Sequence, residues 1–111
     1  MAEGNYNNPI AISSTALPAS EYINNGNSAI IKTGNFKLFK LMIGSLQTQI
    51  PTGTFTDIGT IPEGYRPYQE TNTYLTEGTE RVLITLNTNG TITAYKYTSG
   101  DFVGYYIIPY I

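Results

Sequence analysis

The stretch RVLITLNTNGTITAYKY, residues 81–97, decides the fold class of this 111-residue chain. Two runs rich in β-branched residues flank Asn89-Gly90. An Asn-Gly pair between two such runs is the strongest short-range signal for a β-hairpin. The pattern therefore predicts two antiparallel strands joined by a tight turn at Asn89 and Gly90.

Two registers of this hairpin are compatible with the sequence. A two-residue turn would pair Ile84 with Tyr95. A three-residue loop with its glycine in the left-handed conformation would pair Ile84 with Ala94 and Leu86 with Ile92. We prefer the second register because it builds the cleaner aliphatic face.

The rest of the chain also reads as short strands separated by turn residues. Strands are expected within residues 28–34, 35–50, 53–61, 71–78 and 102–111. Apolar residues occupy both faces of the second of these segments, which predicts that both faces are covered. One face carries Phe36, Leu38 and Met42, and the other carries Phe39, Leu41 and Ile43. A helix is the rival interpretation there, but the turn residues on both sides favour a strand.

These features predict one all-β domain. No segment has a capped helical pattern, and short strands spaced by Gly, Asn and Pro turns are typical of a sandwich or barrel. We expect an antiparallel, jelly-roll-like β-sandwich over residues 16–111. Residues 1–15 are rich in Asn, Ser and Ala and have no sustained period. They are expected to form an arm or linker.

The composition argues against several classes of protein. There is no Cys, so disulfides, thiolate nucleophiles and cysteine zinc sites are excluded. Only 13% of the residues are charged, the net charge is -2 and the pI is near 4.9. Such a chain has no electrostatic footprint for nucleic acid or an anionic membrane. No apolar run has membrane-spanning length, and the N-terminal residues lack the pattern of a signal peptide.

Catalytic chemistry has few residues available. There is no His, which excludes Ser-His and Cys-His arrangements and imidazole metal sites. Carboxylates remain, and most of them lie beside Gly or Pro in predicted turns, where a solvated carboxylate is the simplest explanation. The candidates are Asp57, Glu63, Glu70, Glu77, Glu80 and Asp101. We therefore expect no enzyme, no cofactor and no metal site, with a carboxylate-based glycan hydrolase as the least favoured alternative.

Tyrosine is the positive feature of the sequence. Tyr offers a rigid apolar ring and a hydroxyl, which suit both subunit interfaces and the stacking of sugar rings. Any single tyrosine is more simply explained as a core or interface residue. As a group with few charges around them, they predict that part of the surface is covered by further copies of the chain. The second half contains Tyr65, Tyr68, Tyr74, Tyr95, Tyr97, Tyr105, Tyr106 and Tyr110.

The order of these segments resembles the C-terminal domains of bacteriophage tail-fibre, baseplate and minor structural proteins. The likeness lies in IKTGNF, PTGTFTDIGTIPEGYRP and VLITLNTNGTITAYKYTSG, followed by the aromatic last strand. LPAS, residues 17–20, is similar to the segment that precedes some of these domains. The resemblance covers roughly residues 16 to 111.

This resemblance implies a β-sandwich assembled as a homotrimer on the virion, at a tail-fibre or baseplate tip or in a head fibre. Its implied role is attachment to a host cell-surface saccharide, and the arm would contact other virion proteins. Only a short arm precedes the domain, so we expect either an excised domain or a small separate virion component. A purely structural trimerisation or capsid-decoration module is the alternative. The receptor-binding residues remain unknown at this level.

The segment IPEGYRP within this likeness is expected to form a structural corner. Its two prolines fix φ, its glycine permits a sharp turn, and Tyr65 can tuck its ring under the corner. Arg66 is expected to bind backbone carbonyls or a carboxylate such as Glu63 or Glu70. The corner motif is Ile61, Pro62, Gly64, Tyr65, Arg66 and Pro67.

Overall fold

The computed structural model describes residues 11–44 and 46–111, and all regular structure in them is β-strand. None of these residues belongs to a helix long and apolar enough to span a membrane. Residues 36–43 form a strand, as predicted. The strands are β1 (Ile12–Ala16), β2 (Ala29–Thr33), β3 (Phe36–Ile43), β4 (Thr56–Thr60), β5 (Thr71–Glu77), β6 (Glu80–Leu86), β7 (Thr91–Lys96) and β8 (Gly104–Tyr110).

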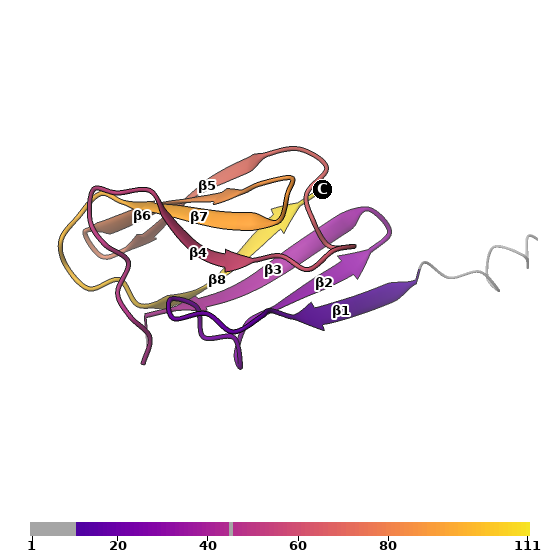
Figure 1. Cartoon of the computed structure of the whole chain (residues 1–111), viewed down its shortest axis with the longest axis horizontal. Helices are drawn as coiled ribbons and strands as arrows, with labels where there is room; N and C mark the ends of the chain where they lie inside the picture. The colour runs from indigo at the N-terminus through magenta and orange to yellow at the C-terminus, as the bar shows by residue number, and fades with distance from the viewer. Residues whose placement is uncertain (1–10, 45) are drawn as a thin grey trace, which may run out of the picture.

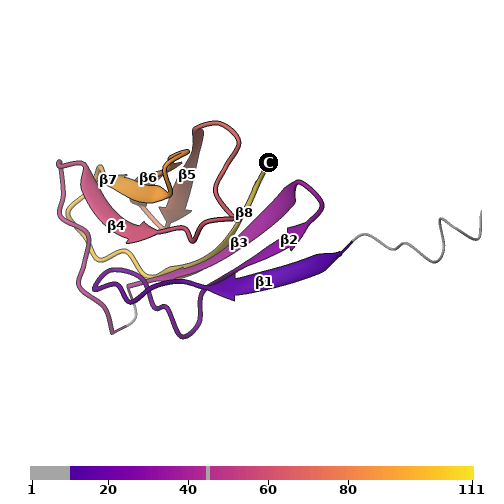
Figure 2. The same ribbon diagram turned by 45° about the vertical axis from the view of Figure 1, so that its right-hand side comes forward.

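The strands form two antiparallel four-stranded sheets that pack face to face, as Figures 1 and 2 show. The first sheet has the order β1-β2-β3-β8, and the second has the order β4-β7-β6-β5. The second order is a Greek key, because β4 lies beside β7 and reaches β5 by a long connection. The first sheet instead keeps three consecutive strands side by side. The fold therefore contains one Greek key, where a jelly roll contains two.

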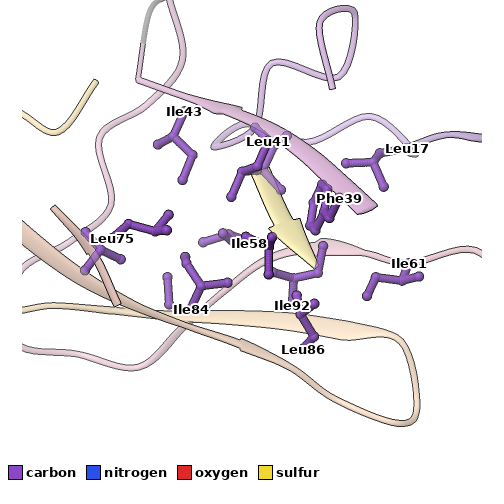
Figure 3. Close-up of a cluster of buried hydrophobic side chains, with 14 of the residues drawn as sticks. Leu17, Phe39, Leu41, Ile43, Ile58, Ile61, Leu75, Ile84, Leu86 and Ile92 are labelled. Atoms are coloured by element: carbon purple, nitrogen blue, oxygen red, sulfur yellow. The ribbon is translucent and has the colours of Figure 1, made fainter. Parts of the chain in front are cut away.

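The hydrophobic core lies between the two inner faces. Phe39, Leu41 and Ile43 on β3 are fully buried and point toward the second sheet, from which Ile84 and Ile92 approach (Figure 3). Burial of each such side chain contributes about 1.5–3 kcal/mol to stability. The alternation of buried and mostly half-buried residues along β3, β6 and β7 shows which side chains face the core and which face outward.

The β6–β7 hairpin has the register expected for a three-residue loop. Gly90 is in the left-handed region with a φ of 93°. The Asn89 side-chain oxygen accepts a hydrogen bond from the backbone N–H of Thr91 at 2.9 Å, which holds the loop in place. The observed pairs are Leu86 with Ile92 and Ile84 with Ala94.

The sandwich begins earlier than the sequence predicted. Residues 1–15 were expected to form an arm, but Ile12 to Thr15 belong to β1, which pairs with β2 along its whole length. This strand has no apolar alternation because it lies at the edge of the sheet, with most of its side chains exposed. Residues 1–10 of the predicted arm lie outside the described residues.

Side-chain hydrogen bonds join the two sheets along both open sides. On one side, the Ser20 hydroxyl accepts the backbone N–H of Ile23 at 3.1 Å and donates to the carbonyl of Ile58 on β4 at 2.5 Å. On the other side, the Tyr106 hydroxyl of β8 donates to the carbonyl of Thr76 on β5 at 3.2 Å. These contacts connect the edges of the two sheets.

One end of the sandwich contains a buried lysine with a full set of partners. Lys96 is 2% exposed, its Nζ lies 3.9 Å from a Glu80 carboxylate oxygen, and it donates to the carbonyls of Thr98 and Gly100. A hydrogen bond from Thr98 is the largest of the effects that lower the pKa of Glu80. The Glu80 carboxylate therefore stays ionised beside Lys96. Together, Lys96 and its partners tie the β7–β8 connection to the start of β6.

Candidate functional site

The outer face of the second sheet carries a cluster of aromatic side chains. Pairing of β5, β6 and β7 places Tyr74, Leu83 and Tyr95 in one row across the sheet. Tyr97 lies in the next row opposite Arg81, to whose carbonyl it donates its backbone N–H at 3.0 Å. We call Phe55, Tyr74, Arg81, Tyr95 and Tyr97 the aromatic platform.

The rings of the platform contact one another in a continuous series. The ring centroids of Phe55 and Tyr95 are 4.7 Å apart, those of Tyr95 and Tyr97 are 4.9 Å apart, and those of Tyr74 and Tyr97 are 6.2 Å apart. All three pairs lie in the range of favourable aromatic contacts. Phe55 and Tyr74 are 69% and 59% exposed, so the rings are open to a ligand.

Arg81 lies near two of these rings. Its guanidinium carbon lies 4.5 Å from the ring centroid of Tyr97 and 5.4 Å from that of Tyr74. The arginine makes no salt bridge within the described residues. Desolvation is the largest effect that raises the pKa of Tyr97, followed by its side-chain interaction with Tyr74. The Tyr97 hydroxyl therefore keeps its proton at neutral pH, and Arg81 supplies further donors beside it.

Polar side chains border the platform in the adjacent row. The Thr85 hydroxyl donates to the side-chain oxygen of Asn72 at 2.6 Å, and the Asn72 amide lies 3.4 Å from the Glu70 carboxylate. Thr93 pairs with Thr85 in the same row. Exposed rings next to amide, hydroxyl and carboxylate groups can stack on the apolar face of a sugar and bind its hydroxyls.

The outer face of the first sheet is chemically different. Apolar side chains from all four strands lie on it, and Lys40 is the one charged residue among them in the described strands. Ile107 lies directly opposite Lys40 and is 57% exposed. We call this surface the apolar face: Ile12, Ile31, Phe36, Leu38, Met42, Tyr105, Ile107 and Pro109.

The apolar face modifies the prediction made for residues 36–43. Within a single chain only one face of β3 is buried, whereas Phe36 on the other face is 47% exposed and Leu38 and Met42 are half-buried. Contiguous apolar surfaces of this kind on small domains are typical of interaction sites.

The corner motif forms the long connection of the Greek key. Gly64 has a φ of 91°, which a residue with a side chain rarely adopts, and Tyr65 donates its backbone N–H to the carbonyl of Pro62 at 3.1 Å. Pro67 is buried, and the half-buried Tyr65 packs against the core. The buried Tyr110 hydroxyl of β8 donates to the Tyr65 carbonyl at 2.7 Å, which joins the corner to the first sheet.

The corner also interlocks with the β6–β7 turn. The Ile61 backbone N–H donates to the carbonyl of Gly90 at 2.7 Å, and the Arg66 side chain donates to the carbonyl of Ile61 at 3.3 Å. Arg66 therefore has a backbone carbonyl as its partner, one of the two kinds that the sequence suggested. The two motifs singled out in the sequence are direct neighbours in space.

The carboxylates considered for catalysis are dispersed. Glu80 is held by the buried lysine described above, and the other five are exposed. Within residues 11–44 and 46–111, no three acidic side chains come close enough together to hold a metal ion.

Sequence reasoning missed how the aromatic platform is assembled. It identified the tyrosines as a group but selected neither Phe55 nor Arg81, because four segments meet there only once the strand register is known. The available signal was the period-two spacing of Tyr95 and Tyr97, which places both rings on one face of an extended chain.

No protein-family model matches this chain, and no curated protein is significantly similar to it.

Proposed function

We propose that this protein is a bacteriophage virion component whose β-sandwich assembles as a homotrimer and attaches to a saccharide on the host cell surface. The aromatic platform is the observation that carries the proposal. Four exposed or half-buried rings on a rigid sheet, with an arginine between them and a polar row beside them, match what saccharide recognition requires.

The apolar face supports self-association as the second part of the proposal. In a homotrimer it would be buried between subunits, which removes Phe36, Ile107 and their neighbours from water. The number three comes from the resemblance to phage fibre domains. The platform lies on the opposite sheet and would stay accessible in such an assembly.

Binding to an array of bacterial surface polysaccharides tests the proposal. Tyr97→Ala is expected to weaken binding about tenfold or more, because it removes the ring that contacts Tyr74, Tyr95 and Arg81. Tyr97→Phe is the matched control, since it keeps the ring and loses only the hydroxyl. Its binding should stay much closer to that of the unaltered protein.

The same experiment separates the proposal from the purely structural alternative. A folded trimer that binds no polysaccharide on the array would favour a trimerisation or decoration module. Equal binding by Tyr97→Ala and the unaltered protein would exclude the platform as the saccharide site.

A further inference from the structure

A second site lies at the end of the sandwich where the β2–β3 turn, the corner motif and Ile111 come together (Figure 1). It is a pocket of about 520 Å³. Three of the six cationic side chains of the protein line it, and no acidic side chain of the described residues does. We call it the cationic pocket, lined by Lys32, Asn35, Lys37, Arg66, Tyr68 and Ile111.

Lys37 is unusual for a lysine because it is buried. It is 6% exposed, and its ammonium lies 5.4 Å from the ring centroid of Tyr110. Within the described residues its ammonium makes no hydrogen bond and no salt bridge. Lys96, the other buried lysine, has a carboxylate and two carbonyls as partners. A buried charge without such partners is unfavourable, so Lys37 lacks the compensation that Lys96 has.

A second lysine faces Lys37 across the sheet. Lys32 and Lys37 are directly paired on β2 and β3, and like charges in this position repel each other. Desolvation lowers the pKa of Lys37 most, and the charge of Lys32 lowers it further. Lys32 is held in place because its Nζ donates to the carbonyl of Gly64 at 2.8 Å.

Arg66 completes the set of donors. Its Nε is occupied by the carbonyl of Ile61, while its terminal amino groups have no hydrogen-bond partner among the described residues. Among the described residues, none of the three cations forms a salt bridge with a carboxylate. A guanidinium and two ammonium groups around one pocket are suited to an oxyanion, which would neutralise their repulsion.

We propose that the cationic pocket binds an oxyanionic group, a phosphate or a carboxylate, through Lys32, Lys37 and Arg66. The ligand class is a small anion or an anionic group carried by a larger molecule. This site is separate from the aromatic platform, and the proposal does not depend on saccharide binding there.

Thermal unfolding of the full chain tests the site with inorganic phosphate and glucuronate as probes, against sodium chloride at matched ionic strength. Either probe should raise Tm saturably by several degrees above the chloride control, since a ligand that binds only the folded state stabilises it. A response to phosphate alone assigns the site to phosphate groups, and a response to both includes carboxylates. If neither phosphate nor glucuronate raised Tm above the value in chloride, the proposal would be overturned.

Lys37→Met provides the sharper test because it should raise the Tm measured without anion and remove the increase in Tm that an anion causes. Without anion the variant should melt a few degrees higher than the unaltered protein, since a desolvated ammonium that faces Lys32 is replaced by an apolar chain of similar length. The increase in Tm with phosphate or glucuronate should be lost. Lys40→Met, which removes the same charge from the apolar face, should keep that increase.

A Lys37→Met protein that retains the full response would contradict the assignment. If Lys37→Met fails to fold, Lys32→Met is the variant to test instead, because Lys32 is only half-buried and lies outside the core. Equilibrium dialysis of radiolabelled phosphate against this variant should then show at least a tenfold loss of affinity. Unchanged affinity would contradict the proposal.

Discussion

Gly90→Ala is expected to lower the free energy of unfolding by about 2–5 kcal/mol, because a left-handed backbone costs about 1–2 kcal/mol for an ordinary residue and overpacking adds about 1–3 kcal/mol. Gly90 has a φ of 93°. A Cβ at this position would lie 2.5 Å from the Arg66 Nε and 2.8 Å from the Ile61 carbonyl oxygen. Since Ile61 belongs to the main chain of the corner, the strain would displace the Greek-key connection. Urea denaturation measures the change.

Gly78→Ala is the matched control for this substitution. Gly78 also has a positive φ, of 60°, in the β5–β6 turn, but apart from its chain neighbours no atom of the described residues lies within 4 Å of a Cβ built there. Gly78→Ala should therefore lower the free energy of unfolding only by the cost of the left-handed backbone, roughly 1 kcal/mol. If Gly90→Ala cost no more than Gly78→Ala, the contact between hairpin and corner would contribute nothing to stability.

Ile107→Glu is expected to convert a protein of three times 12.2 kDa into a monomer of 12.2 kDa. The side chain is 57% exposed on the apolar face, so a carboxylate there is solvated in the free chain and desolvated in an assembly. Lys40 lies directly opposite on β3 and can pair with the new carboxylate, which preserves the fold. Size exclusion with light scattering measures the mass.

Ile107→Leu is the control for shape and should keep the mass of the unaltered protein. A single-chain mass for the unaltered protein at micromolar concentration would refute self-association through this face. A trimeric Ile107→Glu protein would move the interface to another surface.

Local signals in the sequence were sufficient for strands β2 to β8 and their turns. The hairpin at Asn89 and Gly90 could be predicted with its register because turn chemistry and aliphatic pairing both act within residues 81–97. Strand β1 could not, because its exposed edge position needs no apolar alternation. The order of strands within the sheets also lay beyond local reasoning, since the pairing of β4 with β7 depends on the long corner connection.

The sequence predicted the residue type of the aromatic platform but not where in the fold either candidate site would lie. The tyrosines were visible as a group, yet the platform requires the register of β5, β6 and β7 to bring Tyr74 near Tyr97. The cationic pocket was not anticipated at all. Its lysines come from paired strands and its arginine from the corner, which are 29 residues or more apart in the sequence. Such sites depend on tertiary structure, which no single segment encodes.

Hydroxyl-radical footprinting of two tyrosines is the most direct test of the roles assigned to the two outer faces. Tyr105 on the apolar face and Tyr97 on the platform are 46% and 41% exposed in one chain, so a monomer would label both similarly. We predict that Tyr105 is protected and Tyr97 is labelled in the native protein, and that a bound polysaccharide then protects Tyr97 as well. Equal labelling of the two tyrosines, or no change at Tyr97 when the polysaccharide is bound, would contradict the assignment.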